Sequence, residues 1–354
     1  MSVSHPAVKA VPAALLSLYA LLALSISLLL TACGGGGNSG GGIPTPTPTP
    51  STANEWTWMS GSSTIYAPGV YGTLGTPGSS NVPGSRFDSI SWIDSSGNLW
   101  LFGGDGYDST GADGFLNDLW EFNPTTKQWT WVSGSNTVNA NYVYGTLGVP
   151  ASTNVPGGRL GAVSWTDGSG NLWLFGGGGY APTGGYLNDL WEYSPTTKEW
   201  TWVSGSNTGS GSVTVGVPGV YGTLGVPAVT NIPGGRMSSV RWIDSSGNLW
   251  LFGGSGYDST GTFGTLNDLW EFSRTSKEWT WMSGSNTIPK QGAGQPGVYG
   301  TLGEPAITNV PGNRFGSISW IDSSGNLWLF GGVTSDAPGG QDAGWINDLW
   351  RYQP

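Results

Sequence analysis

The sequence predicts an all-β fold: a propeller of four blades, each an antiparallel sheet of four strands. One unit recurs, beginning at Arg86, Arg159, Arg236 and Arg314. Each copy holds short runs rich in Trp, Phe, Ile and Val between Gly, Pro, Asn, Asp and Ser, a composition typical of strands joined by turns. No stretch shows helical periodicity. Small repeated sheets bury both faces only against their neighbours, which favours a propeller.

The strands follow in order within each copy. The first copy, 86–134, reads RFDSISWIDSSGNLWLFGG, a glycine-rich spacer, then NDLWEFNPTTKQWTWVSG. The turns DSSGN and NPTTKQ and the spacer divide it into four strands. The second and third copies are 159–205 and 236–284, whereas the fourth, 314–352, ends after its third strand. The last blade therefore lacks its outer strand.

A match for the missing strand stands at the other end of the chain. The C-terminus ends YQP and the domain opens STANEWTW, which together rebuild the YSPTTKEWTW turn of the second copy. We therefore expect Trp56 to Trp58 to form the outer strand of the fourth blade and to close the ring. A ring left open, or completed by a second chain, is the alternative.

These landmarks also carry a family resemblance. A diglycine, then an aromatic residue, then a Trp seven positions later resembles the kelch repeat, and the resemblance covers residues 55–354. It implies propeller blades like those of the galactose oxidase central domain. One departure is that Ser89, Ala162, Ser239 and Ser317 stand where many kelch repeats have His. The landmarks are Gly103, Gly104, Phe122 and Trp129; Gly176, Gly177, Tyr193 and Trp200; Gly253, Gly254, Phe272 and Trp279; and Gly331, Gly332 and Tyr352, which no Trp follows.

Residues 1–32 read as a signal peptide. Lys9 precedes an apolar stretch, and Leu-Thr-Ala-Cys33 resembles the bacterial lipobox, whose Cys is lipidated. Cys33 is the only cysteine in the chain. An uncleaved membrane helix is the alternative, because the stretch is long enough to span a bilayer. The resemblance implies a lipid anchor, and Gly34 after the Cys implies the outer membrane of the bacterial envelope.

We expect residues 33–54 to form a tether and residues 55–354 to form the propeller domain. The tether joins a flexible GGGGNSGGG segment to a stiffer PTPTPTP spacer. The chain has 12 Lys and Arg against 22 Asp and Glu, a net charge of −10. This acidic balance is unlike the basic surface of a nucleic-acid-binding protein, so we expect no nucleic-acid partner.

Catalytic and metal motifs are scarce. The only histidine, His5, lies in the signal segment, so His-dependent triads and His-based metal sites are excluded. The copper chemistry of galactose oxidase, which needs His ligands, is therefore not expected. Asp108 to Gly114 resembles a calcium loop but lacks the acidic residue that closes one. We predict no enzyme activity, no metal and no cofactor.

Most carboxylates recur once per blade, which predicts structural roles. They include Asp118, Asp189, Asp268 and Asp348 of the NDLW motif, with Glu121, Glu192 and Glu271 beside them. The DSSGNLW hairpins resemble the sialidase Asp-box but carry one extra residue, so a tight Asx turn is the simpler interpretation.

The long loops predict a binding face. Loops after the second strand and between blades are long, rich in aromatic residues and on one side of the sheets, where binding commonly resides. Aromatic residues beside polar groups suit sugars or extended peptides. The candidate ligand-binding residues are Tyr107, Tyr180, Tyr257 and Trp345 of the second turns, with Arg86, Arg159, Arg236 and Arg314 at the mouth of the axial channel. For Tyr71, Tyr144, Tyr221 and Tyr299 of the linking loops, repeated packing is the favoured interpretation.

The sequence thus predicts a lipid-anchored envelope module that binds a glycan or protein partner through the long-loop face. The alternatives are a structural envelope protein without a soluble ligand, and a carbohydrate-active enzyme such as a sugar mutarotase.

Overall fold

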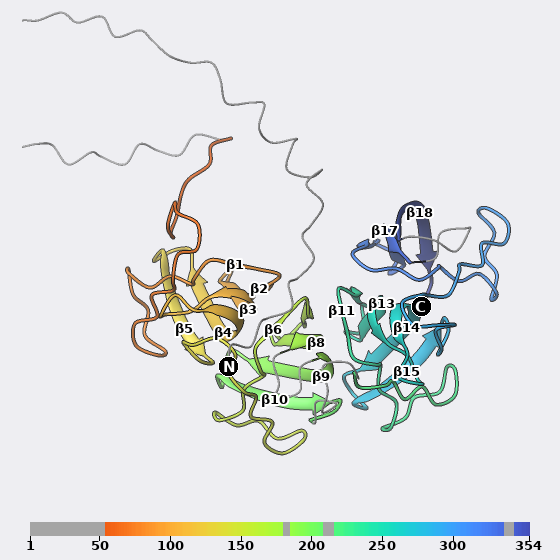
Figure 1. The fold of residues 1–354 in the computed structure, drawn as a ribbon, viewed down its shortest axis with the longest axis horizontal. Coiled ribbons are helices and arrows are strands. Elements are labelled where there is room, and N and C mark those ends of the chain that lie inside the picture. Colours follow the sequence, from red (N-terminus) through yellow and green to blue (C-terminus); the bar gives the residue numbers. More distant parts are fainter. Residues whose placement is uncertain (1–53, 180–184, 208–215, 336–342) are drawn as a thin grey trace, which may run out of the picture. The chain divides into compact units, whose positions relative to one another are not determined.

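The structure, a computed structural model, describes residues 54–179, 185–207, 216–335 and 343–354 (Figure 1). The chain divides into two compact units, Met1–Thr57 and Trp58–Pro354. The predicted signal peptide and nearly all of the predicted tether lie outside the described residues. Within the described residues every named element is a β-strand, and no helix could cross a membrane.

The strands form four successive antiparallel sheets, as the repeats predict. The first sheet contains β1 (Arg86–Phe87), β2 (Ile90–Ile93), β3 (Leu99–Tyr107), β4 (Asp113–Asn123) and β5 (Gln128–Ser133). Because β1 and β2 both pair with β3, they form one inner strand with a break at Asp88, whose φ of 51° is left-handed. The first sheet is therefore a four-stranded meander whose innermost strand is interrupted, and the second and third share this arrangement.

The remaining sheets repeat this order. The second contains β6 (Arg159–Leu160), β7 (Val163–Thr166), β8 (Leu172–Gly179), β9 (Gly185–Ser194) and β10 (Glu199–Ser204). The third contains β11 (Arg236–Met237), β12 (Val240–Ile243), β13 (Leu249–Tyr257), β14 (Phe263–Ser273) and β15 (Glu278–Ser283). The fourth contains only β16 (Ile318–Ile321), β17 (Leu327–Thr334) and β18 (Gly344–Tyr352).

The diglycine lets neighbouring sheets approach closely. Gly103 and Gly104 have φ of 63° and 98°, and the pairing of β3 with β4 shifts at this point. A Cβ on Gly103 would lie 2.9 Å from the carbonyl oxygen of Arg159 in the next sheet. Only glycine fits, since the backbone is left-handed and another backbone occupies the side-chain space.

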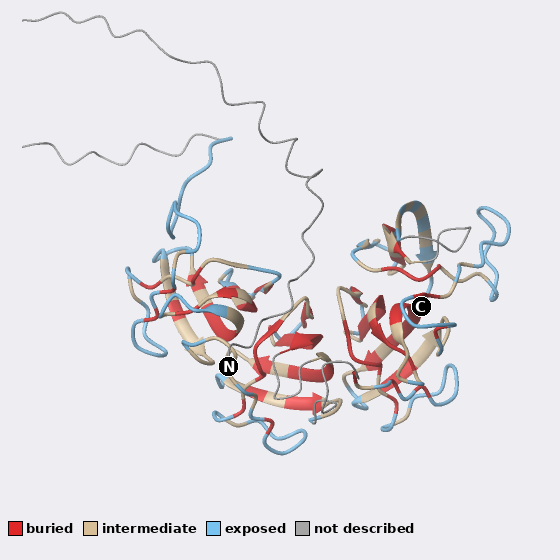
Figure 2. Ribbon diagram, viewed as in Figure 1, coloured by how far each residue is buried: buried red, intermediate tan, exposed pale blue. Residues whose placement is uncertain are grey.

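The hydrophobic core lies between consecutive sheets. Separate clusters of buried aromatic and aliphatic side chains join the first sheet to the second, the second to the third, and the third to the fourth. The buried residues lie mainly on the strands and the exposed ones mainly on the loops (Figure 2). Inner-strand indoles also cross each boundary: Trp92 Nε1 donates to Trp173 O at 3.2 Å, and Trp165 Nε1 to Trp242 O at 2.9 Å. The Trp at the equivalent inner-strand position of each repeat thus donates a hydrogen bond to the backbone of the next sheet.

The fourth sheet has no outer strand in the described residues. Residues 54–60 form no strand, and Trp56 and Trp58 are 102% and 69% exposed. The structure therefore shows the repeated sheets but not the closure of the ring, which stays a prediction.

Candidate functional site

The four repeated arginines form buried ion pairs inside the sheets. The guanidinium of Arg159 makes two bonds to the Asp189 carboxylate, at 2.7 and 2.8 Å, and donates to the carbonyl oxygens of Gly157 and Gly176. Its side chain is 1% exposed. The same arrangement recurs in the other sheets, as the pairs Arg86 with Asp118, Arg236 with Asp268 and Arg314 with Asp348.

Each of these aspartates also accepts bonds from a tyrosine and a tryptophan. The Tyr144 hydroxyl donates to Asp189 Oδ2 at 2.8 Å, and Trp191 Nε1 donates to the same oxygen at 2.7 Å. Burial and the adjacent carboxylate raise the pKa of Tyr144 far above its ordinary value. The linking-loop tyrosines therefore join the loop to the sheet, the packing role favoured from the sequence.

The arginines were predicted to line a channel mouth and bind ligand. The structure places their donors on carboxylate and carbonyl oxygens, so they have little capacity left for a ligand. This pairing was not predicted from the sequence, although one Arg, one Tyr and one Asp recur together in every unit and could have indicated it.

Two other acidic motifs also have structural partners. Asp94 Oδ1 accepts bonds from the backbone N–H groups of Ser96 and Asn98, which is the Asx turn expected for DSSGN. Asp108, in the weak calcium-like loop, accepts bonds from the backbone of Thr110, Ala112 and Val138. Across the described residues, no group of three or more His, Cys, Asp or Glu is placed to hold a metal.

The second-turn aromatics do not share one environment. Tyr257 is 6% exposed and packs against Tyr186 and Phe263, with ring centroids 6.0 and 5.3 Å away. Trp345 is 87% exposed. Tyr180 lies outside the described residues. The predicted binding residues therefore do not form one continuous site: Tyr257 packs in the interior, while Trp345 is open to solvent.

Tyr107 belongs to an accessible aromatic pair, which we call the tyrosine platform and define as Tyr66 and Tyr107. Their ring centroids are 5.4 Å apart at an interplanar angle of 48°. Tyr66 is 64% exposed and has a left-handed φ of 60°. Such a backbone conformation is uncommon for a bulky residue and often marks functional positions. Tyr66 was not predicted from the sequence, because its loop ends in the same YGTLG motif as the linking loops.

Two carboxylates accompany the platform. In the ladder between β3 and β4, Asp113 is directly opposite Tyr107, and Asp105 is two residues before Tyr107 on the same strand face. Desolvation, followed by the charges of Asp113 and Asp88, raises the pKa of Asp105. Desolvation and the Asp113 charge also raise the pKa of Tyr107. Aromatic surface and hydrogen-bond acceptors therefore lie together at the long-loop end of the first sheet.

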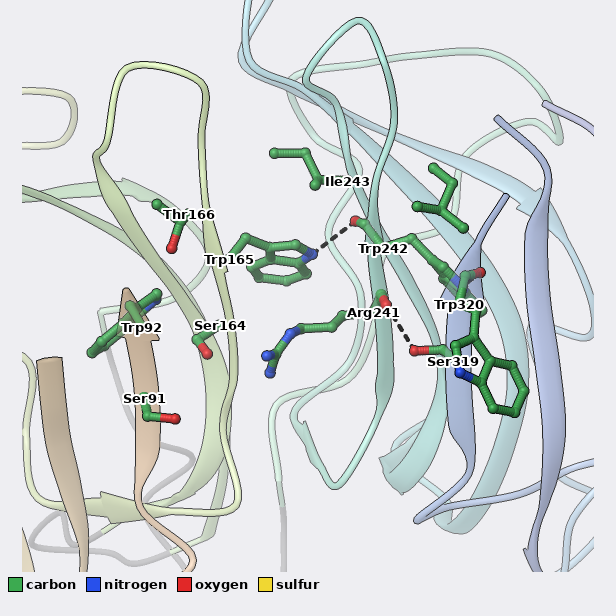
Figure 3. Close-up of a pocket in the computed structure, with 11 residues that line it drawn as sticks. Ser91, Trp92, Ser164, Trp165, Thr166, Arg241, Trp242, Ile243, Ser319 and Trp320 are labelled. Atoms are coloured by element: carbon green, nitrogen blue, oxygen red, sulfur yellow. Dashed lines mark hydrogen bonds between the residues drawn. The ribbon is translucent and has the colours of Figure 1, made fainter. Parts of the chain in front are cut away.

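A second site lies where the inner strands meet. A cavity of 280 Å³ is lined by residues of β2, β7, β12 and β16, including Ser91, Ser164, Arg241 and Ser319 (Figure 3). Arg241 is not one of the repeated arginines, and nothing in the sequence pattern predicts a role for it.

Comparisons with known proteins identify neither a family nor a function for this chain. No protein-family profile matches the chain, and no curated protein matches it. Among solved structures, the chain is similar to the structure of YjhT, with a TM-score of 0.46 and 15% identity over 75% of this chain and 68% of that one. At this level the similarity indicates nothing about ligand or activity.

Proposed function

We propose that the protein is a lipid-anchored binding module of the bacterial cell envelope, and that it recognises a glycan through the tyrosine platform. The observation that carries the proposal is the exposed Tyr66 ring held 5.4 Å from Tyr107, beside Asp105 and Asp113. A protein partner on the same long-loop end is the alternative ligand.

The chemistry of the platform suits a neutral sugar. A tyrosine ring offers an apolar face for the C–H groups of a pyranose, and its hydroxyl offers a polar end. The carboxylates of Asp105 and Asp113 accept hydrogen bonds from sugar hydroxyls. A few polar groups beside aromatic surface are the usual composition of a small-molecule site.

The proposed membrane location rests on Cys33 and on the predicted signal peptide before it. In a Cys33→Ser variant, lipid cannot attach, so the protein should leave the membrane fraction or remain unprocessed. Metabolic labelling with a radioactive fatty acid should mark the parent and not the variant. A label that persists in the Ser variant would contradict the lipoprotein assignment.

The glycan proposal is tested by binding the parent and the Tyr66→Ala, Tyr107→Ala double variant to a glycan array. We expect specific glycan signals in the parent and at least a tenfold weaker affinity in the variant, about 1.4 kcal/mol. The matched control is Trp345→Ala, which removes another exposed aromatic outside the platform. Loss with Trp345→Ala alone would move the site away from the platform.

The array also separates the alternatives. If no glycan binds while a protein partner is retained through the platform, the ligand is a protein. Chemical conversion of a bound sugar, followed by NMR of its anomeric protons, would support the mutarotase alternative. Absence of every soluble ligand would favour a structural envelope role.

A further inference from the structure

The chain contains two nearly identical segments in different surroundings. Residues 55–65 repeat residues 278–288 with a single change, at Ser63. The second copy contains β15, and its Ile288 is 8% exposed in a hydrophobic cluster of the third sheet. The counterpart, Ile65, is 77% exposed. Because the two sequences agree, the difference in burial comes from the neighbouring sheet and not from the segment.

The exposed copy nevertheless has the local conformation of the docked one. In both copies the indole of the second Trp donates to the backbone oxygen two residues later, at 2.8 Å. The next residue has a left-handed φ, 91° at Gly61 and 84° at Gly284. The hydroxyls of Ser62 and Thr64 lie 2.8 Å apart, and those at the equivalent positions after the first sheet lie 2.9 Å apart. Residues 58–66, which we call the strap, are therefore preformed for docking.

Tyr66, the last residue of the strap, matches Asn139 in the loop after the first sheet. Both residues have a φ of 60°. The backbone N–H of Asn139 donates to Phe115 O on β4 at 2.7 Å. In the fourth sheet, Trp345 on β18 stands at the position of Phe115. The left-handed backbone of Tyr66 thus suits a bond to the carbonyl oxygen of Trp345.

One asparagine in each of the first three sheets holds the docked segment. Asn117 Oδ1 accepts a bond from Ser135 N at 2.9 Å, and Asn267 Oδ1 accepts one from Ser285 N at 3.0 Å. The amide nitrogen of Asn117 also donates to Pro156 O, in the loop that enters the next sheet, at 3.1 Å. A single side chain thus joins the segment that leaves its own sheet to the loop of the following one.

Asn347 is the counterpart of these asparagines in the fourth sheet. It is exposed and makes neither bond in the described part of the chain, whereas its three equivalents are at most 4% exposed. By the same positions in the repeat, its partners are Ser62 N of the strap and Pro83 O of the first linking loop. The acceptor, the donor and the preformed segment are therefore all present in one chain.

We infer that the strap docks on the long-loop end of β17 and β18 of its own chain, where Asn347 holds it. Ser62 N donates to Asn347 Oδ1, and Ile65 packs against Ile346, the counterpart of the residue that Ile288 contacts. Docking within the chain is favoured over docking on a second copy, since the tethered strap is present at high effective concentration.

Docking also fixes the tyrosine platform. The backbone of Tyr66 is then held by the fourth sheet, while its ring stays 5.4 Å from Tyr107 on the first sheet. The residue after the strap, Ala67, is already bonded to the start of the first sheet, because its oxygen accepts from Ser85 N at 2.9 Å. The platform therefore spans the junction of the two sheets. Only this consequence rests on the proposed function of the platform.

Hydrogen exchange of the full chain tests the docking, because residues 58–65 and 281–288 have nearly the same intrinsic exchange rates. Protection reports local opening, so we expect the protection of residues 58–65 to lie within tenfold of that of residues 281–288. Asn347→Ala should accelerate exchange of the strap at least tenfold. The matched control is Asn141→Ala, which removes an exposed asparagine of another linking loop and should change nothing.

A second variant separates docking from a general loss of folding. Asn347→Asp keeps the acceptor oxygen for Ser62 N and loses the donor for Pro83 O, so it should retain most of the protection of the strap. The inference is wrong if the strap exchanges like a free peptide in the parent, or if Asn347→Ala leaves its exchange unchanged. Protection that appears only at high protein concentration would place the strap on a second copy and overturn docking within one chain.

The glycan array tests the consequence for the platform. Asn347→Ala leaves Tyr66 and Tyr107 in place, yet it should weaken the array signals at least tenfold, since Tyr66 loses its support. Signals at the parent level from a variant with an unprotected strap would show that the platform does not need docking. If the parent itself gives no signal, the glycan proposal fails, whereas the exchange comparison still decides whether the strap docks.

Discussion

The first three sheets and the fourth are formed by repeats of similar sequence, yet equivalent residues are buried in the first three and exposed in the fourth. Trp92, Trp165 and Trp242 are 4%, 4% and 7% exposed, whereas their counterpart Trp320 is 51% exposed. At another position of the same face, Leu119, Leu190 and Leu269 are at most 5% exposed, and Leu349 is 57% exposed. Because the local sequence is nearly unchanged, the difference shows that the next sheet, not the sheet itself, encloses this face.

The first sheet lacks a neighbour on its opposite face. Leu99 is 41% exposed, while Leu172, Leu249 and Leu327 at the same position are at most 1% exposed. The described chain therefore carries two unfilled apolar faces, each matching one that is filled elsewhere in the same chain. We expect the two faces to meet when the ring closes.

The linking loop of the fourth sheet also lacks specific partners. Asn81 Nδ2 donates both to Thr76 O and to Trp129 O of an outer strand. The equivalent Asn309 Nδ2 keeps only the first kind of bond, to Glu304 O. Tyr299 is 55% exposed, because no outer-strand indole covers it as Trp131 covers Tyr71.

One segment of the chain has the sequence needed to supply the strand that the fourth sheet lacks. The motif Trp-Thr-Trp occurs four times, and three copies lie in β5, β10 and β15. The fourth copy, Trp56 to Trp58, is the only one outside a strand in the described residues. By the register of β9 with β10, it would place Thr57 opposite Arg351.

The largest effect on stability is expected from removing the two indoles of the Trp56 to Trp58 segment. If this segment closes the ring, Trp56→Ala with Trp58→Ala should destabilise the last sheet, since closure would bury both indoles and loss of one buried Trp costs about 3–5 kcal/mol. Hydrogen exchange in β18 should accelerate, while exchange in β9 stays unchanged. Protection of β18 at the parent level would show that the segment does not pair with the last sheet.

A disulfide trap distinguishes pairing within one chain from pairing between chains. In a Cys33→Ser background, Thr57→Cys with Arg351→Cys should form a disulfide within a monomer, as facing residues permit. Thr57→Cys with Trp345→Cys is the control, because Trp345 lies at the far end of β18. Disulfide-linked dimers from the first pair would indicate a ring completed by a second copy.

An intermediate effect is expected from the buried ion pairs. Asp189→Ala should cost about 3–5 kcal/mol, because it leaves the Arg159 charge buried without its partner. Asp348→Ala should cost a similar amount in the parent and less in the Trp56→Ala, Trp58→Ala variant, where water reaches the pair with Arg314. Urea unfolding of the parent, Asp348→Ala, the Trp56→Ala, Trp58→Ala variant and their combination gives the coupling energy between the pair and the closing segment. Equal costs in both backgrounds would mean that the closing segment does not enclose this pair.

The smallest effect is expected at the short hairpins, which are complete in all four sheets. Hydrogen bonds from Asn326 and Trp328 hold the pKa of Asp322 well below its usual range. A lowered pKa stabilises the fold above about pH 4 and less as the pH falls through the folded value. Asp322→Asn should therefore reduce stability at pH 7, and the gap to the parent should narrow at pH 3.

Asp94→Asn is the matching variant in the first sheet. Although burial opposes it, hydrogen bonds from Trp100 and Asn98 lower the pKa of Asp94. The stability that Asp94→Asn loses should follow the same pH dependence, and urea unfolding at pH 7 and pH 3 measures it. A pH-independent gap for either variant would show that the turn, not the charge, carries the effect.

The sequence predicted the sheets well because their signals are local. Runs such as LWLFGG and turns such as DSSGN specify a strand and its end within a few residues, and the repeat multiplies the evidence. The ion pair of Arg159 with Asp189 escaped prediction because its partners lie on different strands and are brought together only by folding. Tyr66 and Arg241 were missed for the opposite reason: neither residue recurs in the other copies, so the repeat gives no signal for it.

The tryptophan bonds between sheets have an evolutionary consequence. Each runs from an indole of one repeat to a backbone oxygen of the next, and a backbone oxygen is present whatever the side chain. A duplicated unit would therefore find its donor and acceptor already in place on both sides. The number of units in such a chain can change by unequal recombination without any new contact having to evolve.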